Sequence, residues 1–221
     1  RNYKQKQAIG IFEKNELNQK LLLTQMNPHF IFNSIDNIQS LIYNKQEKDA
    51  VNYLTKFSKL TRQILENSNE SYVSLSEELA MIDNYLVIQQ LLYNNKFNFS
   101  ITVDEAIDPE SIVVPPMLTQ PFIENAIKHG LKNKSENGFI TIRFYWRDKQ
   151  LVFEVSDNGI GFNNDEKSNG NKSLAMKITK ERLANIAKKS DFEIYTQNLF
   201  DADKQVVGAK VYFDIPYLYE N

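Results

Sequence analysis

The chain has 221 residues, of which 42% are hydrophobic and 12% aromatic, and its formal net charge is −2. This length accommodates one large or two small domains, and the small net charge gives no general reason to expect nucleic acid or an anionic membrane surface as a partner. Because the chain contains no cysteine, disulfides, thiolate zinc sites and cysteine nucleophiles are excluded. No apolar run approaches the roughly 18 residues of a membrane span, and no signal peptide is visible. The chain opens at Arg1 inside a polar stretch, so we expect it to be part of a longer protein.

The first part of the chain has a helical pattern. Residues 1–43 predict one long helix, which a polar turn at 45–48 separates from a second helix that runs to about Glu66. Each helix carries an apolar stripe at the spacing of a coiled-coil seam. The two stripes are Ile31, Ile35, Ile38 and Ile42, and Tyr53, Phe57, Leu60 and Ile64. Since one helical hairpin cannot cover both stripes, we expect a homodimer that forms a four-helix bundle.

A polar stretch at 66–71 predicts a linker. We therefore place a dimerisation hairpin at 1–70 and a second domain at 71–221. Ser74 and Glu77 match a capping box, in which the serine oxygen accepts a backbone N–H and the glutamate reaches back to the cap. This pair predicts the start of a helix that runs to about residue 92.

The second domain then alternates strands with helices. Residues that alternate in polarity predict strands at 97–103, 140–146, 151–155 and 211–215. Helices are expected at about 117–131 and 174–188, and a loop at 163–172. One-sided strands with helices gathered on their buried face describe an α+β two-layer sandwich.

His29 is one of only two histidines and follows Pro28, which predicts a helix kink at that point. Its helical face is otherwise polar and lies off the isoleucine stripe, carrying Asn33, Asp36, Asn37 and Ser40. We therefore expect an exposed imidazole. A neutral imidazole is a competent nucleophile near pH 7 because its unperturbed pKa is about 6.5, and Asn33 is placed to hold the ring in one tautomer. A lone exposed histidine, considered by itself, is more often an ordinary surface residue.

The run QPFIENAIKHG at 120–130 predicts a helix on which Glu124 shares a face with Lys128, and Asn125 with His129. Two donors, one cation and one carboxylate on about one turn suit a magnesium-bound triphosphate. An asparagine oxygen is a hard ligand for Mg²⁺, a lysine offsets phosphate charge, and a glutamate can act as a general base. By itself the tetrad is equally typical of an amphipathic helix with a surface ion pair.

The run DNGIGF at 157–162 directly follows a predicted strand. Asp157 is suited to accept a hydrogen bond from an exocyclic amine, while Gly159 and Gly161 allow the backbone to approach a flat base closely. Alone, this spacing is more typical of a turn. It matches neither the dinucleotide fingerprint nor the P-loop.

Together these runs resemble LytS/YehU-like sensor histidine kinases over about residues 20–216. In that family Pro-His-Phe is followed by an asparagine four residues after the histidine. The combination of ENAIKHG with DNGIG resembles the Bergerat-type ATPase domain, in which the asparagine holds Mg²⁺, the aspartate reads adenine and the glycines shape the pocket. Carried over, these residues are Asn125, Asp157, Gly159 and Gly161. The resemblance also implies that Lys128 and His129 contact the nucleotide.

The run at 171–183 resembles the segment that closes the nucleotide lid, and the resemblance implies that Leu174 and Thr179 contact the nucleotide. Two departures stand out. Relatives usually carry a glycine near Ala175, and many carry Arg-Phe where this chain has Leu92-Tyr93. In contrast to the LytS type, many other histidine kinases carry an acid directly after the histidine, where this chain has Phe30. Any general base must therefore come from elsewhere, and Glu124 is our candidate.

The resemblance implies the catalytic core of a dimeric sensor histidine kinase that uses ATP and Mg²⁺. The γ-phosphoryl group would pass to His29 and then to an aspartate of a response regulator receiver domain. We expect the core on the cytoplasmic side of the inner membrane, attached through an upstream sensor segment. The alternative is a catalytically weak or inactive nucleotide-binding adaptor, explained by the altered lid. An ATP-hydrolysing clamp is disfavoured because it does not require a Pro-His hairpin.

Overall fold

A computed structural model describes residues 28–67, 70–131, 137–162, 180, 183 and 193–219. The chain divides into two compact units, Arg1–Ser71 and Tyr72–Asn221. The predicted loop at 163–172 and most of the predicted helix at 174–188 lie outside the described residues, as do residues 1–27 of the predicted first helix. Within the described ranges, no helix is both long and apolar enough to cross a membrane.

The first unit contains a helical hairpin, as predicted. Helix α2 spans Pro28–Tyr43 and helix α3 spans Glu47–Asn67, with Lys45 in the left-handed conformation (φ 59°) in the turn between them. The ring centroids of Phe30 and Phe57 lie 6.0 Å apart. The buried hydroxyl of Tyr53 donates to Ser34 Oγ at 3.2 Å. The two helices therefore share both an aromatic contact and a buried polar contact.

The hairpin leaves a second apolar face uncovered in the single chain. Ile35 is 42% exposed and Ile42 is 57% exposed, whereas Leu60 and Ile64 of the α3 stripe are buried. Apolar side chains on both helices form this open face, namely Phe32, Ile35 and Ile42 on α2 and Val51, Leu54 and Leu65 on α3. Ile31 and Ile38 of the same stripe are half-buried, so the α2 stripe is covered only in part.

The second unit is built on a five-stranded sheet in the order β2-β4-β5-β7-β6, whose strands β2 and β4 are parallel and whose other neighbours are antiparallel. Its strands span Phe97–Val103 (β2), Gly138–Arg147 (β4), Gln150–Asp157 (β5), Tyr195–Phe200 (β6) and Val206–Ile215 (β7). A small antiparallel sheet joins Val73–Ser74 (β1), Ile112–Val114 (β3) and Leu218–Tyr219 (β8). The central strand β5 ends at Asp157. This residue therefore lies between the two strands that flank β5, which are β4 and β7.

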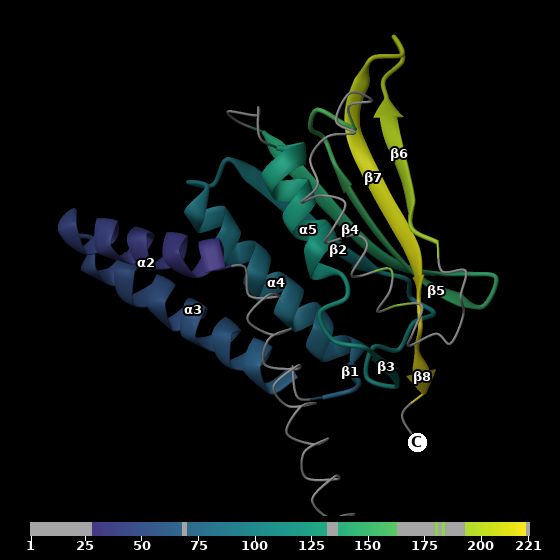
Figure 1. Cartoon of the computed structure of the whole chain (residues 1–221), viewed down its shortest axis with the longest axis horizontal. Coiled ribbons are helices and arrows are strands. Elements are labelled where there is room, and N and C mark those ends of the chain that lie inside the picture. The colour runs from purple at the N-terminus through teal and green to yellow at the C-terminus, as the bar shows by residue number, and fades with distance from the viewer. Residues whose placement is uncertain are drawn as a thin grey trace, which may run out of the picture. The chain divides into compact units, whose positions relative to one another are not determined.

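Helices cover one face of the large sheet (Figure 1). Helix α4 spans Leu75–Leu92 and begins with the predicted capping box of Ser74 and Glu77. Helix α5 spans Gln120–Asn125. Its Phe122 ring packs on Phe213 of β7, at 4.9 Å between centroids, and Phe213 packs on Phe153 of β5 at 5.3 Å. These contacts confirm the α+β two-layer sandwich.

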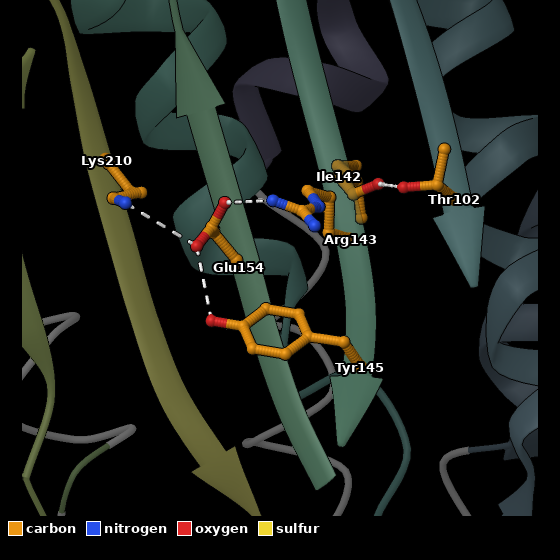
Figure 2. Close-up of polar contacts among 6 residues, drawn as sticks. All are labelled: Thr102, Ile142, Arg143, Tyr145, Glu154 and Lys210. Atoms are coloured by element: carbon orange, nitrogen blue, oxygen red, sulfur yellow. Dashed lines mark hydrogen bonds and ion pairs between the residues drawn. The ribbon is translucent and has the colours of Figure 1, made fainter. Parts of the chain in front are cut away.

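The opposite face of the sheet is polar. Glu154 of β5 lies 3.6 Å from Arg143 Nη1 and 3.7 Å from Lys210 Nζ, and it accepts a hydrogen bond of 3.3 Å from the Tyr145 hydroxyl (Figure 2). Because side chains alternate between the faces of a strand, Phe153 and Asp157 lie on the side of the helices and Glu154 on the opposite face, where it is buried among its polar partners. Asp157 is therefore directed towards the helical layer.

Candidate functional site

The carboxylate of Asp157 is the centre of the candidate site. The residue is 7% exposed, and its Oδ1 accepts a hydrogen bond of 2.9 Å from the backbone N–H of Gly159. This local bond turns the chain sharply at the end of β5 and holds one carboxylate oxygen. Asp157 also lies in register with Ile140 of β4 and Ala209 of β7, so three strands support its backbone.

Three glycines surround Asp157. A Cβ atom added at Gly130 would lie 2.5 to 2.6 Å from the carboxylate atoms of Asp157. A Cβ at Gly159 would overlap the carbonyl of Gly130, and a Cβ at Gly208 would overlap the carbonyl of Asp157. Ile160 N also donates to the carbonyl of Gly130 at 3.1 Å. Backbone segments from three elements therefore meet at one point. A side chain at any of the three glycine positions would prevent this close approach.

This arrangement refines the predicted role of the glycines. Gly159 allows contact with the backbone of Gly130, and Gly161 has φ 72°, a conformation that glycine adopts most readily. The predicted set contained neither Gly130 nor Gly208. Gly130 stands at the end of the ENAIKHG run, which was its only signal. Gly208 opens a run that resembles the family's last strand, but its contact with Asp157 depends on the pairing of β7 with β5.

Two asparagine side chains fasten the loop that follows Asp157. Asn158 Oδ1 accepts from Phe139 N at 2.8 Å, and its Nδ2 donates to the carbonyl of Asn137 at 2.9 Å. Asn198 Oδ1 accepts from Phe162 N at 2.6 Å, and its Nδ2 donates to the carbonyl of Phe162 at 3.2 Å. The loop is thus attached to β4 at one end and to β6 at the other.

The segment that carries Asn125 is not a regular α-helix. Helix α5 ends at Asn125 and a π-helical turn, η1, spans Ala126–Gly130. The prediction of one continuous α-helix over 117–131 is therefore wrong in its second half. A π-turn contains an extra residue, is rare and often occurs at functional sites. Here it brings the backbone of Gly130 against Asp157.

Glu124 and Lys128, which were predicted to share a helical face, form an ion pair with 3.5 Å between Oε2 and Nζ, and Asn125 beside them is half-buried. Tyr85 of α4 interacts with Glu124, and its hydroxyl accepts a hydrogen bond of 2.7 Å from Gln89 Nε2. Burial raises the pKa of Tyr85 well above its usual value, and the charge and hydrogen bond of Glu124 raise it further. The Tyr85 hydroxyl therefore remains protonated and donates to the Glu124 carboxylate.

Several of the other predicted site residues have side chains that lie outside the described residues. His29 lies near the start of the described part of α2, but its side chain is outside the described residues, as is that of His129. Asn33 is exposed on α2. Leu174 and Thr179 are also outside the described residues. In the described part of the chain, no three acidic or histidine side chains gather in a way that would hold a metal ion.

Two family models match the chain. A histidine kinase model matches residues 17–97. A model of the histidine kinase-, DNA gyrase B- and HSP90-like ATPases matches residues 117–217. The second match contains the Asn125 segment, the Asp157 loop and Gly208.

Named relatives match as well. The chain is 38% identical over 142 residues to the sensor protein LytS of Staphylococcus saprophyticus, covering 64% of this chain and 24% of that protein. It is 32% identical over 216 residues to LytS of Oceanobacillus iheyensis, covering 91% and 35%. The chain therefore spans about a quarter to a third of the length of these relatives. A solved structure of the Erythrobacter litoralis blue-light activated histidine kinase has a TM-score of 0.49 at 14% identity, covering 86% of this chain and 58% of that one.

Proposed function

This chain belongs to the histidine kinase family and carries its ATPase domain, and from that premise we propose that it transfers the γ-phosphoryl group of ATP to His29. The observation that carries this proposal is the anchored Asp157, whose carboxylate lies against Gly130 and Gly159 and whose backbone carbonyl lies against Gly208. Such a rigid acceptor at the end of a central strand suits recognition of a flat base. We propose that Asp157 accepts the hydrogen bond of the adenine amine.

Asn125 and Lys128 are proposed to hold the phosphates. Their segment offers one amide oxygen, one ammonium group and one carboxylate, which fits a triphosphate that carries Mg²⁺. When bound, the ion offsets the charge that develops on the transferred group. We assign the ion to Asn125 together with the phosphate oxygens. His129, Leu174 and Thr179 are proposed to complete the nucleotide contacts.

In the transfer step, an unprotonated ring nitrogen of His29 attacks the γ-phosphorus. A bond forms between nitrogen and phosphorus, while the bond from phosphorus to the bridging oxygen breaks and ADP leaves. The imidazole then loses its remaining N–H proton, and we propose Glu124 as the base that accepts it, since Phe30 cannot. Asn33 is proposed to orient the ring. The Tyr85 hydroxyl holds the Glu124 carboxylate in place.

The phosphohistidine then passes its phosphoryl group to an aspartate of a response regulator receiver domain, which is the proposed partner. We also propose a homodimer in which the open face of the hairpin, defined above, is covered by a second copy. In the full-length protein, this core would lie on the cytoplasmic side of a membrane and be attached through an upstream segment.

The test is incubation of the chain with γ-³²P-labelled ATP. Transfer to histidine predicts a label that is lost in acid and survives base, as expected of a phosphoramidate. A non-catalytic adaptor, the alternative function, would bind ATP and acquire no label. Incubation of labelled protein with a receiver domain then tests the second step.

A further inference from the structure

The start of α5 is attached to α4 by a buried carboxylate that the proposed mechanism does not use. Glu78 lies on α4 and is 1% exposed. Its Oε2 accepts from the backbone N–H of Met117 at 3.0 Å, and its Oε1 accepts from the Thr119 hydroxyl at 3.1 Å. One side chain therefore fixes two points of a segment that is distant in sequence.

The segment that Glu78 holds has an unusual backbone. Met117 has φ 58°, in the left-handed region that residues with a Cβ atom other than asparagine and aspartate seldom adopt. Met117 is also buried, at 2% exposed. The bond from its N–H to the Glu78 carboxylate is a charge-assisted hydrogen bond, which is stronger than a neutral one. Glu78 thus stabilises a conformation that the local sequence disfavours.

The anchored segment leads directly into the nucleotide-binding helix. The carbonyl of Thr119 accepts hydrogen bonds from Phe122 N at 3.1 Å and from Ile123 N at 3.2 Å, so the first turn of α5 is built on Thr119. Asn125 follows within the next turn. A shift of the anchored segment would therefore displace Asn125.

We propose that Glu78 is a positioning residue of the nucleotide site, acting through Met117 and Thr119 to place Asn125. The inference rests on the proposed role of Asn125 towards Mg²⁺. A glutamine at position 78 carries no charge and has one acceptor oxygen, so it cannot accept from both donors. If that oxygen keeps the Met117 N–H, the Thr119 hydroxyl must reverse and accept from the NH₂ group, and both bonds become neutral. Removing this charge should therefore disturb the placement of Asn125 more than the adenine pocket around Asp157, which β5 supports.

The experiment measures the affinity of ATP for the whole chain, by calorimetry, with Mg²⁺ and with EDTA. In the wild type we expect Mg²⁺ to strengthen ATP binding. In Glu78→Gln the affinity in EDTA should change by less than about threefold, whereas the gain from Mg²⁺ should fall by about tenfold, the size of one lost hydrogen bond to a charged group. Asp83→Asn is the matched control, because Asp83 is an exposed acid on the same helix and should leave both values unchanged.

A second substitution distinguishes positioning from a general structural role. Glycine adopts a positive φ without strain, so adding Met117→Gly to Glu78→Gln should restore part of the Mg²⁺ gain, although the double variant melts at a lower temperature. Three results would overturn the inference: a normal Mg²⁺ gain in Glu78→Gln, a lower melting temperature as its only effect, or no recovery in the double variant. A wild type that binds ATP without any gain from Mg²⁺ would instead refute the proposed role of Asn125.

Discussion

The carboxylate of Asp157 lies directly against the backbone of Gly130, so that a Cβ atom at position 130 would be 2.5 Å from Asp157 Cγ. This contact joins the end of the helix that carries Asn125 to the end of the central strand. The proposed adenine acceptor and the proposed phosphate-binding segment are thereby held in one fixed arrangement. Changes at either residue should affect nucleotide binding before they affect the fold.

Gly130→Ala is expected to weaken ATP binding by at least tenfold, because the new methyl group must displace the Asp157 carboxylate or the π-turn. Overpacking of this kind also destabilises a fold by about 1–3 kcal/mol. Calorimetry at a temperature well below the melting transition separates the two effects. An ATP affinity equal to that of the wild type would show that the contact with Asp157 is not needed for binding.

Asp157→Asn should weaken ATP binding because it replaces the charged acceptor of the adenine amine by a neutral one. The expected loss is about 1.5–3 kcal/mol, the range for a hydrogen bond to a charged group. GTP, which lacks an amine at that position, should lose much less from the substitution. If both nucleotides bind the variant as they bind the wild type, the base is recognised elsewhere.

His29→Gln keeps hydrogen-bonding capacity and removes the imidazole nucleophile. It should abolish labelling by γ-³²P-ATP while ATP affinity and dimerisation remain those of the wild type. Glu124→Gln should slow labelling by about 10²–10⁴-fold if Glu124 is the general base. Labelling of His29→Gln at the wild-type rate would assign the phosphoryl group to another residue.

Ile35→Lys should weaken the homodimer without unfolding the hairpin. Ile35 is already 42% exposed in the single chain, so the charge becomes buried only if a second copy covers the open face. Sedimentation measures the dimer and circular dichroism the helix content. Ser40→Lys, on the exposed polar face of α2, is the control and should have no effect on assembly. Equal dimerisation of the Ile35→Lys variant would place the interface on another surface.

The stability of the second unit should fall above about pH 10, in part because of Tyr85. Its folded-state pKa is raised well above the ordinary value of 10.0, mainly by burial, whereas the unfolded chain titrates normally. Above pH 10 the unfolded state therefore binds fewer protons than the folded state, so the free energy of unfolding decreases as pH rises. Below pH 10 the contribution of Tyr85 to the free energy of unfolding is constant. Denaturant titrations from pH 8 to 11 should show a shallower decrease for Tyr85→Phe. Tyr43→Phe, at a residue 89% exposed, is the control and should retain the wild-type slope.

Local sequence determined many of the helices and strands of this protein. The Ser74 and Glu77 capping box forms as predicted because its partners are three residues apart. The strand at 140–146 and the pairing of Glu124 with Lys128 follow from periodicity, which needs no distant partner. The family resemblance rested on three short runs, around His29, at 120–130 and at 157–162, each weak alone, and the family models confirm it.

Only the tertiary structure decided which of these elements contact one another at the site. Gly208 meets Asp157 because β7 pairs with β5, and Glu78 holds Met117 across 39 positions of sequence. The π-turn after Asn125 replaces the α-helix that helical spacing predicts, and it brings Gly130 against Asp157. None of these contacts has a local signature, because each depends on the packing of segments that periodicity describes one at a time.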